Sequence, residues 1–280
     1  MPHLIRLSKE ASEGQGDDTF NEIKKTHCQI TNELGIIKNI LENDFAELSD
    51  CVGRMRMEKQ LNDAGLDIFQ SFGERMSSKI FAAYLSSAGI EAKPFNSWEL
   101  GLITTHDFGN AEPIEKSYKP IKDNISKLRF IPVITGFIGK TEKGEVTTLG
   151  RGGSDYTASI FGAAAGADEI QIWTDVDGVM SADPKIVPGA KTIEQISFDE
   201  ASELAYFGAR VLHPKTLLPA INKNIPVKVL NAFNPGHHGT TITKKSRHDD
   251  QVVKAIACKK NITLISIKSS RMLGACPARR

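Results

Sequence analysis

Apolar residues recur at helical spacing through the first quarter of the chain. Over residues 19–41 they stand three or four positions apart, which gives a helix of this range one apolar face. A second run of the same kind covers residues 65–88. Both ranges are predicted to be helices that pack through their apolar faces.

From residue 130 onwards, short apolar runs alternate with helical patterns. Residues 130–138 are apolar without alternation, as expected of a strand buried on both faces. An alanine-rich helical pattern over residues 154–166 precedes another strand over residues 169–175. Two further strands are expected, over residues 145–149 and 225–230. Two further helices are expected as well: one is opened by the capping box Ser197 to Glu200, and the other begins at His213. This order predicts an α/β fold with an open, mainly parallel sheet sandwiched by helices.

The chain is expected to carry one large domain and the start of a second unit. Residues 246–251 are polar and charged, as in a linker. Beyond them, residues 252–258 and 262–267 are typical of two strands, in a unit of about 30 residues that is too short to fold alone. The predicted division is therefore a domain over residues 1–245, followed by a linker and a truncated second unit over residues 246–280.

Composition excludes several classes of function. The formal net charge of +1 gives no polyanion-binding surface, so nucleic acid is not an expected partner. The apolar stretches are far shorter than the roughly 20 residues of a membrane span, and the first residues show no signal or transit pattern. The cysteines are scattered and form no C-x-x-C pair; they are Cys28, Cys51, Cys258 and Cys276. These features predict a cytoplasmic protein with reduced thiols and no zinc site.

The strongest local signal for chemistry is a glycine-rich segment at residues 147–158. A strand leads into Gly150, Gly152 and Gly153 and then into the N-terminus of a helix, an arrangement in which backbone N–H groups can bind an anion. The glycines alone would equally suit a tight turn between strand and helix. Arg151, placed among them, has a planar guanidinium that binds carboxylates through two hydrogen bonds, and it favours an anion site. The spacing matches neither G-x-G-x-x-G nor a P-loop.

Ser154 and Asp155 follow the glycines in the first turn of the predicted helix. Ser154 can cap that helix or bind the same ligand as Arg151. Further along, Thr174 and Asp175 end a predicted strand, where ligands bind in open α/β sheets. The Asp, Gly and Pro residues of this second segment, residues 173–185, would serve equally well as turn formers.

Two further positions are weaker candidates. Glu74 stands beside Gly73 within a helical pattern and could bind a substrate ammonium group, although a glutamate there is more often a surface residue. Arg210 could reach a nucleotide phosphate. His213 is expected to cap a helix, and no third ligand accompanies the His237–His238 pair, so no metal site of the protein's own is expected.

Taken in order, these segments resemble the aspartate kinases of the amino-acid kinase family. The matching stretches are residues 72–74, 135–137, 148–155, 173–178, 183–184, 207–214 and 239–243. The resemblance is close over residues 65–243 and looser before them. It implies ATP-dependent phosphorylation of the side-chain carboxylate of aspartate, the first step towards lysine, threonine and methionine, with Mg²⁺ carried on the nucleotide. It also implies a homo-oligomer, and an ACT-type regulatory region that would begin near residue 246.

The resemblance assigns a role to each candidate residue. Glu74 would contact the substrate amino group, Arg151 and Ser154 a substrate carboxylate, and Asp155 the reacting groups, so Arg151 and Asp155 are the expected catalytic pair. The expected ATP site consists of Thr174, Asp175, Met180, Lys185, Arg210 and Val211. Met180 stands where the family usually has tyrosine, while Lys185 and Arg210 keep the usual charge.

One departure from the family leaves alternatives open. The family begins with strands carrying K-F-G-G-T-S and S-A-M-x-x-V-T motifs, which are absent here, so the chain is expected to be truncated at both ends. One alternative is a non-catalytic remnant that binds ligand or pairs with a complete subunit. Another is a different amino-acid kinase that acts on a carboxylate. A plastid address would have been lost with the missing N-terminus.

Overall fold

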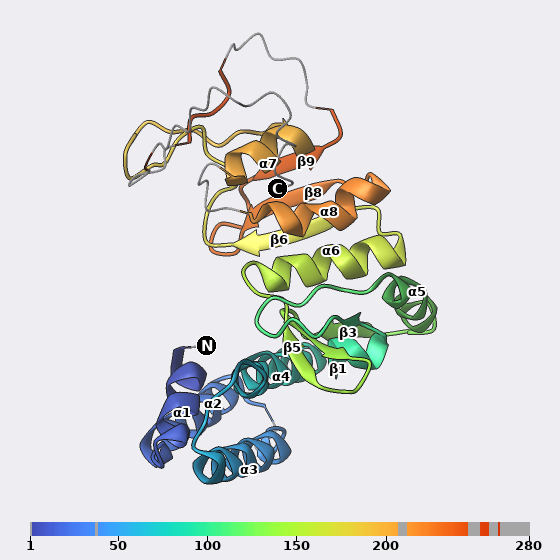
Figure 1. The fold of residues 1–280 in the computed structure, drawn as a ribbon. Coiled ribbons are helices and arrows are strands. Elements are labelled where there is room, and N and C mark those ends of the chain that lie inside the picture. The colour runs from blue at the N-terminus through green and yellow to red at the C-terminus, as the bar shows by residue number, and fades with distance from the viewer. Residues whose placement is uncertain (1, 37–38, 207–211, 246–252, 258–262, 264–280) are drawn as a thin grey trace, which may run out of the picture.

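The computed structural model of the chain describes residues 2–36, 39–206, 212–245, 253–257 and 263 (Figure 1). Four helices occupy the first part of the chain: α1 (Pro2–Ser12), α2 (Asp17–Glu33), α3 (Glu42–Glu58) and α4 (Asp63–Ser87). They pack around one apolar cluster, in which Leu7, Leu48 and Phe72 are fully buried. The predicted helical first quarter is confirmed, and α4 matches the predicted range of residues 65–88 closely.

The predicted helix over residues 19–41 is wrong at its C-terminal end. Helix α2 ends at Glu33, because Gly35 adopts a left-handed conformation with φ of 65° that turns the chain. Ile36 and Leu41 are nevertheless buried in the same core. The spacing of apolar residues therefore predicted which residues are buried even beyond the C-terminal end of α2.

The strands form three small sheets in the part of the chain that the structure describes. Strand β1 (Ala92–Phe95) pairs in parallel with β3 (Ile131–Ile134). A second sheet has the order β2-β4-β5, and a third the order β6-β8-β9-β7. Their bounds are β2 (Ile103–Thr104), β4 (Ile138–Thr141), β5 (Val146–Thr148), β6 (Ile170–Thr174), β7 (Gln195–Ser197), β8 (Val227–Asn231) and β9 (Thr240–Thr243). Parallel pairing predominates, with β4–β5 and β8–β9 antiparallel.

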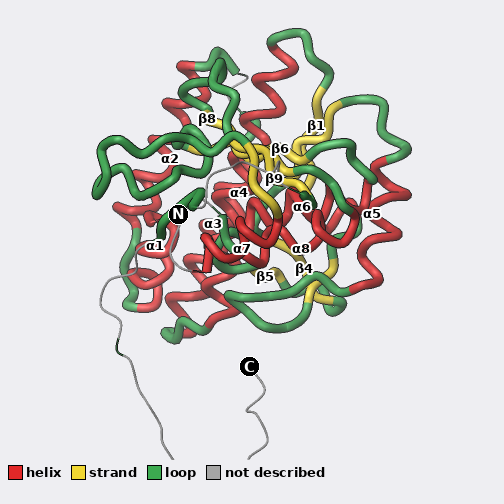
Figure 2. Tube along the Cα trace, turned by 90° about the horizontal axis from the view of Figure 1, so that it is seen from above, coloured by secondary structure: helices red, strands yellow, loops and turns green. Residues whose placement is uncertain are grey.

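The remaining helices lie beside these sheets. They are α5 (Tyr118–Ile125), α6 (Gly153–Ala165), α7 (Phe198–Tyr206) and α8 (Pro214–Lys223), with short 3₁₀ turns η1 (Ser97–Leu100) and η2 (Glu115–Ser117). Helix α6 lies between the β6–β8 strands and the β3–β5 region, and it contributes to the cores on both sides (Figure 1). Seen from above, strands β6 and β9 lie near the middle of the molecule, with helices around them (Figure 2). The predicted α/β class is confirmed, although the expected single open sheet is divided into three.

Several local predictions are confirmed and one is not. In the capping box, Ser197 N donates to Glu200 Oε2 at 2.6 Å and Glu200 N donates to Ser197 Oγ at 3.1 Å. His213 is the N-cap of α8, and its ring nitrogen Nδ1 accepts a hydrogen bond from Lys215 N. Strand β3, in contrast, is not buried on both faces, because Ile131 is 50% exposed.

The predicted strands after residue 251 lie mostly outside the described residues. The described part of the first, residues 253–257, is not a strand, because the Ile256 N–H bonds to the carbonyl of Ser181 in a loop. The domain boundary at residue 245 stays a prediction. None of the described helices has the length and apolar character needed to cross a membrane.

Gly239 gives a direct test of the β8–β9 pairing. Its φ is 64°, and a Cβ at this position would overlap the carbonyl oxygen of Val229. We expect Gly239→Ala to lower the free energy of unfolding by about 2–5 kcal/mol, combining left-handed strain with overpacking. Chemical denaturation measures this loss. Gly236→Ala is the matched control in the same loop, since a Cβ there meets no atom within 4 Å, and an equal loss in both variants would contradict the explanation.

Candidate functional site

The glycine-rich segment forms a tight connection between β5 and α6. Gly150 and Gly152 have φ of 74° and 70°, values that side-chain-bearing residues rarely adopt. A Cβ on Gly150 would lie 2.9 Å from the Gly109 carbonyl oxygen and 2.9 Å from Asn110 Oδ1. The loop that presents Arg151 is therefore packed against residues 109–110 so closely that only glycine fits.

Helix α6 begins without a side-chain cap. Its N-cap is Gly152, which lacks a side chain, and Ser154 lies in the first turn with an exposed side chain. The capping role considered for Ser154 is therefore excluded. The first N–H groups of a helix have no intrahelical acceptor, and together with the helix dipole they favour an anion at this end of α6.

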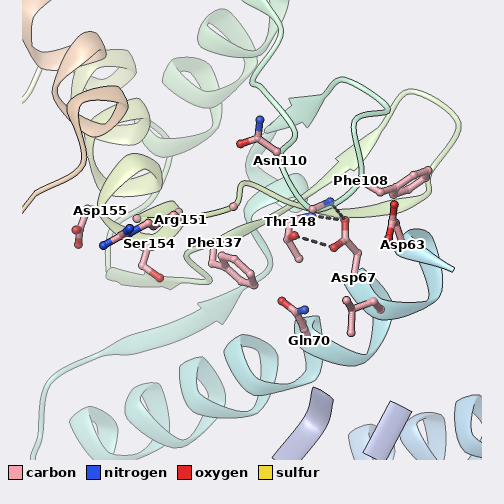
Figure 3. Close-up of a pocket in the computed structure, with 15 residues that line it drawn as sticks. Asp63, Asp67, Gln70, Phe108, Asn110, Phe137, Thr148, Arg151, Ser154 and Asp155 are labelled. Carbon is pink, nitrogen blue, oxygen red and sulfur yellow. Dashed lines mark hydrogen bonds between the residues drawn. The ribbon is translucent and has the colours of Figure 1, made fainter. Parts of the chain in front are cut away.

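A pocket of about 820 Å³ lies in front of this loop (Figure 3). Its walls are the first turns of α4, residues 108–110, Phe137 and Thr148, and the segment from Gly150 to Asp155. Three of the predicted site residues, Arg151, Ser154 and Asp155, line this pocket together. The structure thus brings a guanidinium, a hydroxyl and a carboxyl to one wall.

Glu74 lies close to this wall without lining the pocket itself. Its carboxylate accepts a hydrogen bond from the backbone of Gly136. Ser154 packs against the same glycine, because a Cβ on Gly136 would lie 3.0 Å from Ser154 Cα and Oγ. Glu74 and Ser154 therefore both adjoin Gly136, and Ser154 is three residues from Arg151.

The two carboxyl groups of the site are partly withdrawn from water. Burial raises the pKa of Glu74, although the Gly136 hydrogen bond opposes this effect. Burial also raises the pKa of Asp155, and no described residue donates a hydrogen bond to its carboxyl. Both groups would be stabilised by a cationic ligand, such as an ammonium group or a metal ion.

Gly73 stands beside Glu74 in α4. A Cβ there would lie 3.2 Å from Leu4 Cδ1, which belongs to α1. The close approach at this glycine is therefore helix packing.

The predicted nucleotide residues lie in a different part of the fold. Thr174 ends β6, and its hydroxyl donates to Asp175 at 3.2 Å. Met180 and Lys185 follow in the loop after β6, where Lys185 is exposed. None of these four residues lines the pocket with Arg151. Arg210 and Val211 lie outside the described residues.

Asp177 illustrates the turn-forming alternative for this segment. Its carboxylate accepts hydrogen bonds from the side-chain amides of Asn231 at 2.9 Å and Asn234 at 3.1 Å. These two bonds lower the pKa of Asp177. Asp177 thus fixes the loop after β6 to the end of β8.

Sequence reasoning missed several residues of the pocket. Phe137 lines it with a left-handed φ of 63°, and its N–H donates to Thr157 Oγ1. Asp67 and Thr148 are also in the wall and are hydrogen-bonded to each other (Figure 3). The left-handed backbone of Phe137 has no sequence signature, and a buried aspartate in a helix looks like any other polar position.

Comparisons with known proteins show the family of the chain. Residues 15–231 match the model of the amino acid kinase family. The chain is 43% identical over 257 residues to aspartokinase 2, chloroplastic, of Arabidopsis thaliana, which covers 90% of this chain and 47% of that protein. It is 35% identical to lysine-sensitive aspartokinase 3 of Escherichia coli K12, with 96% and 61% covered.

A solved structure shares the fold. Aspartokinase III of E. coli in complex with aspartate and ADP superposes with a TM-score of 0.78 at 32% identity, covering 88% of this chain and 56% of that one. The chain spans about half the length of the first curated relatives it matches. The family match, which extends from the second helix to the end of β8, establishes that the chain belongs to the amino acid kinase family.

Proposed function

We infer that this chain is the kinase portion of an aspartate kinase, which transfers the γ-phosphoryl group of ATP to the side-chain carboxylate of aspartate. The observation that carries the proposal is the placement of a guanidinium and a half-buried carboxylate around one wall. Arg151 and Ser154 line the pocket, and Glu74 adjoins Ser154 through Gly136. An amino acid has a carboxylate for the first group and an ammonium for the second. The relatives named aspartokinase support aspartate as that amino acid.

Each side chain would act through charge and position. Arg151 would bind a carboxylate of aspartate through two hydrogen bonds, with the Ser154 hydroxyl as a third donor. Glu74 would accept hydrogen bonds from the ammonium group, and Asp155 would orient the reacting groups. The nucleophile is a carboxylate with an ordinary pKa near 4, so it is ionised at neutral pH and needs no general base. Catalysis then depends on alignment and on neutralising charge in the transferred phosphoryl group.

ATP would bind at the carboxyl edge of the β6 sheet. The residues proposed for its site are Thr174, Asp175, Met180, Lys185, Arg210 and Val211. The complex of E. coli aspartokinase III with ADP supports a nucleotide site in this fold. ATP and aspartate would meet between the β6 edge and the α6 N-terminus.

Mg²⁺ would enter with the nucleotide. The described residues include no cluster of three or more His, Cys, Asp or Glu placed to hold a metal ion. Mg²⁺ keeps several waters and is commonly bound by phosphates and one or two carboxylates. Asp155, whose carboxyl receives no hydrogen bond from a described residue, is the side chain proposed to hold it. The ion supplies positive charge to the phosphates.

The remaining biology follows from the proposed reaction. Aspartyl phosphate would be the first intermediate towards lysine, threonine and methionine. A homo-oligomer stays a prediction. The cytoplasmic location also stays a prediction. A plastid is the alternative location, because two relatives are named chloroplastic.

A trapping assay tests the proposal. With ATP, Mg²⁺ and hydroxylamine, which traps acyl phosphates, we expect aspartate to yield a hydroxamate and glutamate to yield none. Isothermal titration with aspartate should show binding in the same preparation. Hydroxamate formed from glutamate but not from aspartate would contradict the assigned substrate. Aspartate binding without turnover would instead favour a non-catalytic fragment.

A further inference from the structure

A buried carboxylate joins α4 to the segment that leads into the glycine loop. Asp67 is 1% exposed and accepts three hydrogen bonds. Its Oδ2 accepts from Thr148 N at 2.8 Å and from Gly109 N at 2.9 Å, and its Oδ1 accepts from Thr148 Oγ1 at 2.7 Å (Figure 3). One side chain thus binds both the end of β5 and residues 108–110.

Both of these partners support the loop that carries Arg151. Thr148 is the last residue of β5 and stands three residues before Arg151. Gly109 contacts the loop directly, since its carbonyl oxygen occupies the space beside Gly150. The segment that contains Gly109 also bonds to Thr148 directly, because Ala111 N donates a hydrogen bond to Thr148 O at 2.9 Å. Asp67 therefore fixes two backbone segments beside the loop: the end of β5 at Thr148 and the segment at Gly109.

Asp67 and Glu74 occupy the same side of one helix. Seven residues at about 100° each complete nearly two turns, so the two side chains leave α4 in almost the same direction, about 10 Å apart along its axis. Both lie within the uninterrupted helix α4. A rigid helix therefore relates the attachment point of the Arg151 loop to Glu74.

We propose that Asp67 is a positioning residue that holds the Arg151 loop at a fixed separation from Glu74, so that both can bind the charged groups of one amino acid. The inference rests on the proposed function for the identity of that amino acid. Asp67 is 1% exposed, and its three hydrogen bonds all go to the protein's own Gly109 and Thr148. A change of as little as 1 Å in such a separation costs about 100-fold in activity when a substrate must be aligned.

The chemistry of Thr148 permits a conservative variant. In Asp67→Asn, the amide oxygen can accept from the two backbone N–H groups in place of Oδ2. The amide nitrogen would then face Thr148 Oγ1, and a threonine hydroxyl can accept a hydrogen bond as well as donate one. Asp67→Asn therefore keeps all three bonds and removes only the charge, whereas Asp67→Ala removes all three.

The experiment compares these variants by ligand binding and by hydrogen exchange. Asp50→Ala is the matched control, because Asp50 is an exposed aspartate in the neighbouring helix α3. Isothermal titration would give the dissociation constants for aspartate and for the non-hydrolysable analogue AMP-PNP. Hydrogen exchange, followed by mass spectrometry without ligand, would report on peptides that cover residues 146–155.

We expect Asp67→Ala to weaken aspartate binding about tenfold or more and to accelerate exchange over residues 148–153. Binding of AMP-PNP should stay within about twofold in every variant. Asp67→Asn should stay within about threefold of the parent for aspartate, with unchanged exchange. Asp50→Ala should match the parent in all measurements.

Several results would overturn the inference. If Asp67→Asn loses as much aspartate affinity as Asp67→Ala, the charge itself binds the ligand. Equal losses for aspartate and AMP-PNP in Asp67→Ala would indicate general loss of structure. Unchanged exchange over residues 148–153 in Asp67→Ala would show that the loop does not depend on Asp67. If the parent binds no aspartate at all, the proposed substrate fails, and the exchange data still decide whether Asp67 holds the loop.

Discussion

Arg151→Ala is expected to weaken aspartate binding about 100-fold, which corresponds to about 2.8 kcal/mol. The guanidinium lines the pocket and belongs to an exposed residue, and no described acidic side chain forms an ion pair with it. Its charge is therefore available to a ligand. Isothermal titration of the variant with aspartate, beside AMP-PNP, measures the effect.

Arg151→Lys separates charge from geometry. Lysine keeps the positive charge and loses the planar fork, so we expect its affinity for aspartate to fall between those of the parent and the alanine variant. AMP-PNP binding should change by less than about threefold in both variants, because the described residues proposed for the nucleotide do not line the pocket with Arg151. Equal losses for aspartate and AMP-PNP would refute the role given to Arg151.

Glu74→Gln is expected to weaken aspartate binding about 10- to 100-fold and, at the same time, to stabilise the unliganded protein. A hydrogen bond between charged groups contributes about 1.5–3 kcal/mol, and glutamine cannot supply the charge. Titration with aspartate at pH 7 measures the first effect. Thermal unfolding without ligand measures the second.

The second effect follows from the pKa of Glu74. Burial raises this pKa above its ordinary value of 4.5, so the folded protein holds the proton more tightly than the unfolded chain. Stability attributable to Glu74 is therefore greatest below pH 4.5 and is lost as the pH rises through the folded pKa. We expect the higher Tm of Glu74→Gln at pH 7 to shrink towards zero as the pH approaches 4.5.

A matched variant tests whether this effect belongs to the site. Glu58→Gln changes an exposed glutamate at the end of α3 and should alter neither the affinity for aspartate nor the pH dependence of Tm. A Glu74→Gln protein that is less stable than the parent at pH 7 would contradict the explanation. So would an aspartate affinity equal to that of the parent.

Local patterns predicted much of the fold. The helix range of α4, the capping box at Ser197, the N-cap at His213 and the strand–glycine–helix order around Arg151 depend on residues that are close in sequence. The end of α2 was missed because burial continues past Gly35 in a connecting segment. The division of the strands into three sheets depends on pairings between segments that are distant in sequence. The periodicity of apolar residues carries no information on such pairings.

The site was predicted in part for the same reason. Arg151, Ser154 and Asp155 share one local motif, and the structure brings them to one pocket wall. The bond between Asp67 and Thr148 joins positions 81 residues apart, so no local signal could reveal it. Glu74 was only a weak candidate from its place beside Gly73, since a half-buried glutamate in a helix has no distinctive neighbours, and the family resemblance strengthened its assignment.

The central claim is that Arg151 and Glu74 bind opposite charges of the same small amino acid. Titration of the parent with aspartate and with succinate, which has both carboxylates but no ammonium group, tests it most directly. We predict that the parent binds aspartate at least about tenfold more tightly than succinate, and that Glu74→Gln binds the two with similar affinity. Succinate binding as tightly as aspartate to the parent would contradict the account.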